Sequence, residues 1–230
     1  MKSYYWPQQS PINLSKDSSH YVQFDNDFLK IHYSGSCSGT FETGHHNFVL
    51  SDFVKNPQLL SFNGQKYILR KIHLHTKSEH DLEGENLGGD IHFVHEIYPI
   101  EDENAAVEDK TLLALGVFFN LCEESEKLKE NELTSFAACF SNALKLFKEG
   151  KGSEETSIYP SKLLPSDRNW FWYEGSLTTH PFSENVTWVV LNSPLKDTKS
   201  KDFEYIHKEA HQEEREIQDL NRRFVLRNFQ

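Results

Sequence analysis

The residue types in this chain that can do chemistry are concentrated in one short stretch. Five of its twelve histidines lie between Lys71 and His95. His73 and His75 alternate with aliphatic residues, so a β-strand would place both imidazoles on one face and the aliphatic side chains on the other. Imidazole nitrogens grouped on one face are common zinc ligands, and the stretch therefore predicts a metal site carried by strands.

A second alternating run follows a polar, glycine-bearing connection. Asp90, His92 and Val94 share one of its faces. If the two strands pair, His73, His75 and His92 can converge on one point, which is the three-nitrogen arrangement of a catalytic zinc site with an open fourth position. On spacing alone, the alternative stays open that these are surface histidines or hydrogen-bonded core histidines.

The strands that must position these histidines belong to a chain with a strong β pattern. Short alternating runs predict a hairpin built from residues 22–24 and 28–33 and further strands at 48–50, 66–69, 186–191 and 223–226. Asn63 and Gly64 predict a tight turn. The nearly continuous apolar run at 111–120 predicts a central strand that is buried on both faces.

Two segments have the periodicity of an amphipathic helix. Residues 133–147 carry apolar side chains at three- and four-residue spacing, with Asn131 as the predicted cap at the start and Gly150 at the end. Residues 203–220 show the same pattern with many charges on the opposite side, which predicts an exposed packing helix.

The chain is predicted to form a single domain over residues 1–230. Aromatic residues make up 13% of the sequence and can fill much of one core, and neither an internal repeat nor a dividing linker is found. Residues 151–169 are rich in Gly, Ser and Pro and are predicted to be a loop. Residues 4–14 hold two prolines and lack periodicity, so they are predicted to form an extended arm.

The formal net charge of −11 limits the partners of the chain. Nucleic acids and anionic membranes both require a basic surface, so we expect neither as a partner. No run approaches the roughly 18 apolar residues of a membrane span, and the first residues lack the apolar core of a signal peptide. Cys37, Cys122 and Cys139 predict free thiols. These features predict a cytoplasmic protein, or a periplasmic or secreted one if a signal peptide has been removed, and they do not indicate its oligomeric state.

Several short motifs occur in an order that is specific in combination. They are QSPINL near the start, TGHH before the histidine-rich stretch, HLH, SEH and DIHFVH within it, and GSLTT and ENVTWVVL near the end. In these motifs the chain resembles the α-class carbonic anhydrases over nearly its whole length. The resemblance implies a mainly β, single-domain fold built on a large twisted sheet of about ten mostly antiparallel strands with peripheral helices.

The resemblance also implies an activity, which is the reversible hydration of carbon dioxide to bicarbonate and a proton. His73, His75 and His92 match the zinc ligands of the family, so Zn²⁺ is the expected cofactor. Thr178 matches the residue that accepts a hydrogen bond from zinc-bound hydroxide, and Glu79 matches the carboxylate that holds this threonine. Zinc in carbonic anhydrases is known to lower the pKa of bound water to about 7, which makes hydroxide available as a nucleophile. Sulfonamides and anions are the expected inhibitors.

Further residues match those that bind substrate or move protons in the family. Thr179 is expected to help place bicarbonate. An apolar wall for carbon dioxide is expected from residues that can equally be plain core: Leu177, Val94, Ala114, Val186 and Trp188. His45 matches the proton shuttle, since histidine titrates near neutral pH, and His46 and His180 are alternatives.

Two departures from the family pattern lie behind the predicted ligands. Asp90 stands where the family usually has Glu, and it can still accept the ring N–H of His92. Lys71 replaces the usual Gln behind His73; an ammonium can only donate, and it adds positive charge near the metal. We therefore expect weakened zinc affinity or reduced turnover, with zinc binding retained.

Two other functions are compatible with parts of the pattern. Relatives on this fold that are weakly active or non-catalytic binding proteins characteristically lose zinc histidines, whereas this chain keeps all three. A cupin metal site built from His73, His75, Glu79 and His92 would lack the second cupin motif and would leave GSLTT unexplained. Hydration of carbon dioxide accounts for more of the sequence than either.

The shuttle assignment predicts that His45→Ala slows hydration of carbon dioxide chiefly at low buffer concentration, because added buffer can replace the missing proton acceptor. Stopped-flow measurement across a series of buffer concentrations checks this. A silent His45→Ala variant would transfer the role to His46 or His180.

Overall fold

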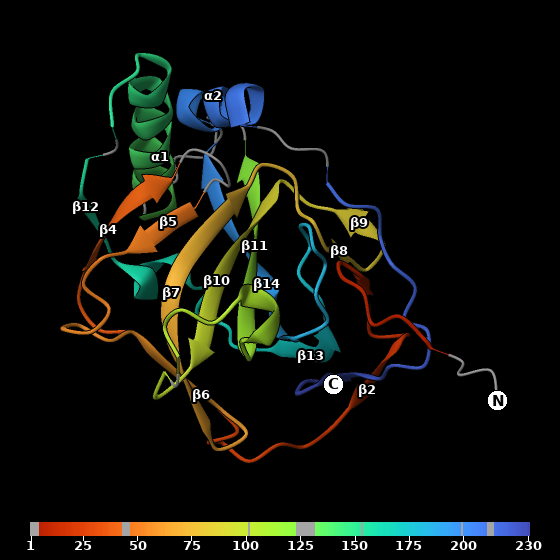
Figure 1. The fold of residues 1–230 in the computed structure, drawn as a ribbon. Helices are drawn as coiled ribbons and strands as arrows, with labels where there is room; N and C mark the ends of the chain where they lie inside the picture. The colour runs from red at the N-terminus through yellow and green to blue at the C-terminus, as the bar shows by residue number, and fades with distance from the viewer. Residues whose placement is uncertain are drawn as a thin grey trace.

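The computed structural model describes residues 5–42, 47–100, 102–122, 132–152, 154–198, 200–210 and 214–230. One twelve-stranded sheet dominates this part of the chain (Figure 1). Its strands run in the order β12 (Thr156–Ile158), β4 (Cys37–Glu42), β5 (Asn47–Leu50), β7 (Gln65–His75), β10 (Gly89–Ile97), β11 (Leu112–Cys122), β14 (Val186–Thr198), β13 (Trp170–Gly175), β15 (Val225–Arg227) and β2 (Ser19–Tyr21). β6 (Leu59–Phe62) joins β7 and carries β3 (Leu29–His32).

Most neighbouring strands of the sheet are antiparallel. The pairs β11–β14 and β15–β2 are parallel. A small second sheet holds β1 (Asn13–Leu14), β8 (Asp81–Leu82) and β9 (Glu85–Asn86). The predicted fold class is confirmed, with twelve strands in the large sheet where about ten were expected.

The helices of the described residues lie at the periphery of the sheet. α1 (Glu132–Lys148) and α2 (Lys201–Ala210) lie side by side near one end of the central strands (Figure 1), with two short 3₁₀ turns elsewhere, η1 (Val107–Asp109) and η2 (Pro160–Leu163). None of these helices is long and apolar enough to cross a membrane.

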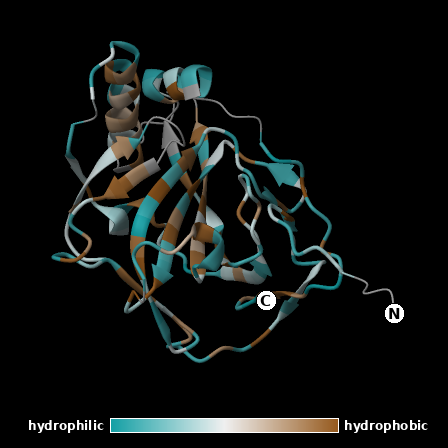
Figure 2. Ribbon diagram, in the orientation of Figure 1, coloured by the Kyte–Doolittle hydropathy of each residue, from teal (hydrophilic) through white to brown (hydrophobic). Residues whose placement is uncertain are grey.

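The central strand β11 separates two apolar clusters. All residues from Leu112 to Phe119 are buried, as the continuous apolar run predicted. Leu113 and its alternate neighbours pack into a cluster with Phe136 and Phe140 of α1, whereas Ala114 packs on the other face with Trp188. Figure 2, in which the ribbon is coloured by hydropathy, shows hydrophobic stretches along the central strands. One face of the sheet is thus covered by helices, and the other packs against both ends of the chain through residues such as Ile12 and Phe229.

Two predicted chain reversals are confirmed. Asn63 and Gly64 have φ of 48° and 78°, and they join β6 to β7 in a tight turn. α1 ends at Lys148, and Gly150 follows with a φ of 72° and donates its N–H to Phe147 O at 3.0 Å. The predicted cap Asn131 lies outside the described residues.

The predicted N-terminal hairpin is wrong. The turn itself forms, since Phe28 N–H donates to Asp25 O at 3.0 Å. The strands on either side then diverge, because β2 pairs with β15 and β3 pairs with β6. Phe28 stacks against Trp170 with ring centroids 6.0 Å apart, and this aromatic contact directs the chain away from a local pairing.

The predicted second helix is too long. α2 ends at Ala210, and residues 214–220 are not helical. Their polar groups bind the N-terminal arm instead: Arg215 donates to Ser10 O at 2.7 Å, and Gln218 N–H donates to Pro11 O at 2.8 Å. These bonds to a distant segment outweigh the local helical preference of the sequence. The predicted loop at 151–169 also contains β12 and η2.

Gly89 predicts a stability effect where β10 passes closest to its neighbours. A Cβ at this position would lie 2.1 Å from Phe119 Cζ and 2.3 Å from His75 O, and a backbone oxygen cannot move aside cheaply. Gly89→Ala should therefore lower the free energy of unfolding by about 2 to 3 kcal/mol, measured by urea denaturation. Gly152→Ala is the matched control, because nothing lies within 4 Å of its Cβ position. Equal midpoints for the two variants would contradict the close approach.

Candidate metal centre and substrate cavity

Three histidines meet where β7 and β10 run side by side. The antiparallel register pairs His73 with His92, and His75 follows two residues later on β7. The ring centroid of His75 lies 5.5 Å from that of His73 and 4.8 Å from that of His92. The structure therefore brings the three predicted ligands together on one face.

Asp90 holds the far side of the His92 ring. Its Oδ2 lies 3.0 Å from Nε2 of His92 and accepts the backbone N–H of Glu79 at 3.1 Å. Burial lowers the pKa of His92, but the charge and hydrogen bond of Asp90, with the charge of Glu79, outweigh it and raise that pKa. Burial likewise raises the pKa of Asp90, yet the surrounding histidines hold it below its usual value. Nδ1 of His92, the other ring nitrogen, faces the space that His75 and Glu79 share with it.

The carboxylate of Glu79 lies between two of the imidazoles. Its Oε2 is 3.6 Å from Nε2 of His75 and 3.6 Å from Nδ1 of His92, and it is buried without a hydrogen-bond donor. Nε2 of His75 is also buried without a hydrogen-bond partner. Buried polar atoms without partners are rare and costly, and a cation among these groups would satisfy the nitrogens and the carboxylate together. The donor set fits a zinc ion.

One difference from the predicted ligand set concerns Asp90. Among the described residues, the group of ligand atoms that lie within 4.8 Å of one another comes from His75, Asp90 and His92. Asp90 thus stands in the group where the prediction has His73. Because its carboxylate already faces Nε2 of His92, Asp90 is better placed to orient that ring than to bind an ion directly.

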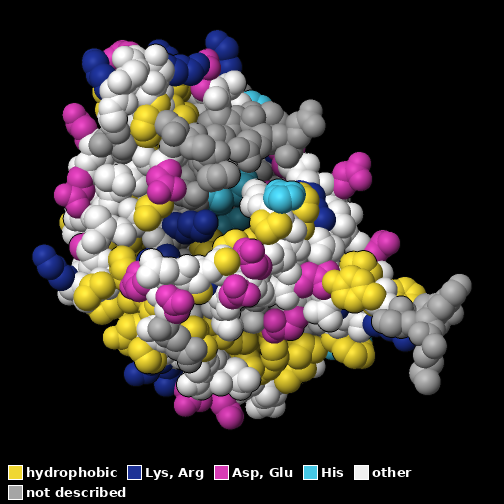
Figure 3. Space-filling model, in the orientation of Figure 1, with side chains coloured by type: hydrophobic (Ala, Val, Ile, Leu, Met, Phe, Trp, Pro, Cys, Tyr) yellow, Lys and Arg dark blue, Asp and Glu magenta, His cyan; other side chains and the backbone are white. Residues whose placement is uncertain are grey.

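A cavity of about 270 Å³ opens beside these histidines. His73 and His92 line it together with Thr178 and Thr179. Its lining also includes every residue of the predicted apolar wall, which are Leu177, Val94, Ala114, Val186 and Trp188. Figure 3 shows a hollow with His side chains inside it and both basic and hydrophobic side chains around it. Residues that are far apart in the sequence are thus collected around one space.

Thr178 lies in the loop that connects β13 to β14. Backbone bonds shape this loop: Leu177 N–H donates to Ser183 O at 3.0 Å, and Phe182 N–H donates to Thr179 O at 2.8 Å. Within the described chain no hydrogen bond joins the Thr178 hydroxyl to Glu79, whose Oε2 faces the histidines. The bond between these two side chains stays a prediction.

The structure describes only one of the three predicted proton relays. His45 and His46 lie outside the described residues. His180 is exposed, and it does not line the cavity.

A buried hydrogen-bond chain supports the site from behind, and sequence analysis missed it. The Tyr173 hydroxyl donates to Oγ of Ser10 at 2.8 Å, so Nε2 of His80 must donate to that hydroxyl oxygen, at 2.6 Å. Ser10 also accepts the Ser176 N–H at 3.1 Å, and Trp188 Nε1 donates to Ser176 O at 3.0 Å. Ser10 and Tyr173 are 163 residues apart, and no local pattern relates them.

His95 lies on the opposite face of β10, as its parity predicted. Its Nε2 accepts the Tyr33 hydroxyl at 2.6 Å, and its Nδ1 donates to Leu113 O at 3.1 Å. Burial lowers the pKa of His95 to about 4, and burial with the charge of His92 lowers the pKa of His80 to about 3. Both rings are therefore neutral at pH 7.

One wall of the cavity is basic, which the sequence did not predict, since Lys71 was expected behind His73 and not in this lining. Arg70 and Lys110 bind the two carboxylate oxygens of Glu96 at 2.8 and 2.9 Å. Lys71 lines the same cavity, where burial lowers its pKa and the charges of Glu42 and Glu96 oppose that effect. Glu96 follows Asp90, His92 and Val94 at two-residue spacing, and this spacing could have placed Glu96 on the cavity face. No local sequence pattern indicated that Lys110 would bind Glu96.

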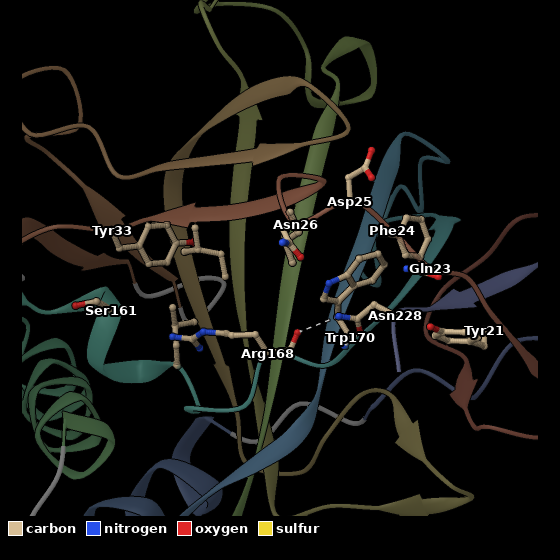
Figure 4. A pocket seen from close by; sticks show the side chains of 13 residues that line it. Tyr21, Gln23, Phe24, Asp25, Asn26, Tyr33, Ser161, Arg168, Trp170 and Asn228 are labelled. Atoms are coloured by element: carbon tan, nitrogen blue, oxygen red, sulfur yellow. Dashed lines mark hydrogen bonds between the residues drawn. The ribbon is translucent and has the colours of Figure 1, made fainter. Parts of the chain in front are cut away.

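A larger cavity of about 540 Å³ lies elsewhere, between segment 21–33 and the start of β13. Figure 4 shows its side chains, among them Tyr33, Phe24, Trp170 and Arg168. Its lining contains no histidine and a single carboxylate, Asp25. It therefore offers no metal-binding group comparable to the histidine site, and the smaller cavity holds the chemistry.

Comparison with known proteins identifies the class. The model of the eukaryotic-type carbonic anhydrase family matches residues 4–229. The chain belongs to this family and is an enzyme of the carbonic anhydrase class, whose reaction is the hydration of carbon dioxide. Carbonic anhydrase 7 of Mus musculus is 31% identical over 204 residues, which cover 82% of this chain and 72% of that protein.

Two solved structures agree with the assignment. The α-carbonic anhydrase of Photobacterium profundum is 26% identical with a TM-score of 0.71, covering 95% of this chain and 88% of that one. The α-carbonic anhydrase of Thermovibrio ammonificans in complex with sulfanilamide is also 26% identical with a TM-score of 0.71, covering 95% of this chain and 86% of that one.

The two buried neutral histidines predict an acid-labile fold. Each has a folded pKa below its unfolded value near 6.5, so the unfolded chain binds more protons and stability is lost as pH falls from about 6.5 toward 4. Each histidine should remove about 2 kcal/mol between pH 7 and pH 5. Urea denaturation at both pH values, in the presence of a metal chelator, measures the sum.

His95→Gln separates this effect from that of the carboxylates. The variant lowers stability at pH 7 because it disturbs the bond to Tyr33, but its further loss between pH 7 and pH 5 should be smaller than that of the parent by about 2 kcal/mol. An unchanged pH difference would contradict the neutral, buried state of His95.

Proposed function

We propose that this enzyme hydrates carbon dioxide reversibly to bicarbonate and a proton, with a zinc ion held by His73, His75 and His92. The observation that carries the proposal is the convergence of buried imidazole nitrogens and the Glu79 carboxylate beside a cavity with an apolar wall. When bound, zinc supplies a Lewis acid that makes a nucleophile derived from water available near neutral pH, as is established for this family.

The carboxylates prepare the ligands. Oδ2 of Asp90 lies 3.0 Å from Nε2 of His92, and this negative charge favours the tautomer that carries its proton on Nε2 and a lone pair on Nδ1. Glu79 places a negative charge beside Nε2 of His75 and Nδ1 of His92. Both carboxylates therefore favour a cation at this point, and they offset part of the repulsion that Lys71 adds from the cavity wall.

The cavity residues bind and place the substrate. Carbon dioxide is apolar, and Val94, Ala114 and Trp188 offer an apolar surface that water solvates poorly, so carbon dioxide can displace water from it. The hydroxyls of Thr178 and Thr179 line the same space, and each can accept one hydrogen bond while donating another. This pairing orients a polar nucleophile and then the oxygens of bicarbonate.

The proton and the compartment complete the proposal. His45, shortly before β5 in the sequence, is the proposed group that carries the proton to solvent. The free thiols of Cys37, Cys122 and Cys139 support a reducing compartment, and we propose the cytoplasm.

Stopped-flow hydration of carbon dioxide, with metal analysis of the same sample after dialysis, tests the proposal. We expect near-stoichiometric zinc and a rate that falls when zinc is chelated or sulfanilamide is added. His92→Ala should lose both zinc and turnover, because it removes the ligand that Asp90 orients. His32→Ala is the matched control, since His32 is exposed on β3 and is not part of the cavity lining.

Two outcomes would overturn the proposal. A zinc-loaded sample that hydrates carbon dioxide no faster than buffer would favour a binding protein on the same fold. A zinc-free sample with full activity would show that the histidines do not hold the catalytic metal.

A further inference from the structure

Among the described residues, the basic wall of the cavity contains one cation without a direct ion pair, Lys71, although the charges of Glu42 and Glu96 act on it from a distance. Arg70 is committed elsewhere: it binds Glu96 at 2.8 Å and Glu103 at 3.4 Å, and its guanidinium stacks 4.0 Å from the ring of Phe53. Lys110 binds Glu96 at 2.9 Å. Glu96 is therefore shared between two cations and has no further charge to offer.

Lys71 differs from these two cations. Within the described residues, no hydrogen bond or ion pair holds its ammonium, although the side chain is half-buried and lines the cavity. In the sheet it is the register partner of Val94 on one side and Val49 on the other, and both are apolar lining residues. The two valines offer the Lys71 ammonium no acceptor, so its N–H groups are available to water or to a ligand in the cavity.

The charge of the lining adds to this deficit. Arg70, Lys71 and Lys110 face the cavity with Glu96 as their one carboxylate, so the lining is positive although the whole chain carries −11. An anion that entered the cavity would find a donor with three N–H groups and a positive potential. It would also find an apolar surface within reach, because Val94 and Ala114 line the same space.

We propose that Lys71 and the adjoining apolar wall form a subsite for a small organic monoanion, a carboxylate or sulfonate on a compact apolar body. The charged group binds the Lys71 ammonium, and the body lies against Val94 and Ala114. This inference deepens the proposed function, since the anion would occupy the space that carbon dioxide needs and would inhibit hydration without requiring a bond to the metal.

Benzenesulfonate is the probe, and methyl phenyl sulfone is its neutral counterpart of similar shape. Isothermal titration calorimetry on the purified full chain gives the dissociation constant of each. We expect benzenesulfonate to bind at least tenfold more tightly than the sulfone. Lys71→Gln should weaken benzenesulfonate about tenfold and leave the sulfone unchanged, because the substitution removes one charge and keeps a polar side chain of similar length.

Two further variants keep the test independent of folding. Lys71→Arg retains the charge and should retain most of the benzenesulfonate affinity. Lys66→Gln removes a charge from the exposed end of the same strand, outside the cavity lining, and should change neither ligand. Equal binding of benzenesulfonate by the parent chain and Lys71→Gln, or by Lys71→Gln and Lys71→Arg, would overturn the subsite.

The metal is the competing anion site, and chelation distinguishes it. Binding that vanishes when zinc is removed and ignores Lys71→Gln would assign the anion to the metal and overturn the inference. Binding that survives chelation and depends on Lys71 supports it. Because calorimetry does not require turnover, an inactive enzyme would refute the proposed function while leaving this measurement valid.

Discussion

The site depends on the register between β7 and β10. His73 faces His92 only because these two residues are paired across the strands, and a slip of one residue would turn one of the two rings into the helix-covered cluster. The register is secured on both sides of the site. Gly89 passes so close to His75 O that no side chain fits there, and β11 pairs along nearly all of β10. The pairing of the two backbones thus sets the convergence of the histidine side chains.

Burying so many polar groups at one point is costly unless they compensate one another. Asp90 lies 3.0 Å from Nε2 of His92, whereas Oε2 of Glu79 has no donor beside the nitrogens of His92 and His75, so a bound cation would supply the missing compensation. The cavity next to them is apolar on one side and basic on the other. The apolar side of the cavity can therefore accept an apolar molecule, and the basic side can accept an anion.

The fold was predictable from sequence wherever a strand is buried on a definite face. β7, β10 and β11 have alternating or continuous apolar patterns, and their faces and the convergence of His73, His75 and His92 follow from parity. The pairing of β2 with β15, and of residues 214–220 with the N-terminal arm, was not predictable, because it rests on hydrogen bonds between segments about 200 residues apart.

The apolar wall of the site and the unusual lysine at position 71 were predicted only from the resemblance to a family. The bond of Lys110 to Glu96 and the position of the Glu79 carboxylate depend on side-chain rotamers, which periodicity does not specify.

Hydrogen bonds between the two ends of the chain connect the N-terminal arm and the C-terminal segment to the interior of the protein. Arg215 and Arg223 bind backbone oxygens of Ser10 and Gln9 at 2.7 Å, and Ser10 in turn accepts the hydroxyl of Tyr173. Fraying of the N-terminal arm would therefore break its bonds to the C-terminal segment, and we expect the two segments to open together. Since Tyr173 also receives the His80 hydrogen bond, opening of the two segments removes support from behind the metal centre. The two ends of the chain thus hold the interior closed, and cleavage of the backbone in either one would disturb the cluster of His75, Asp90 and His92.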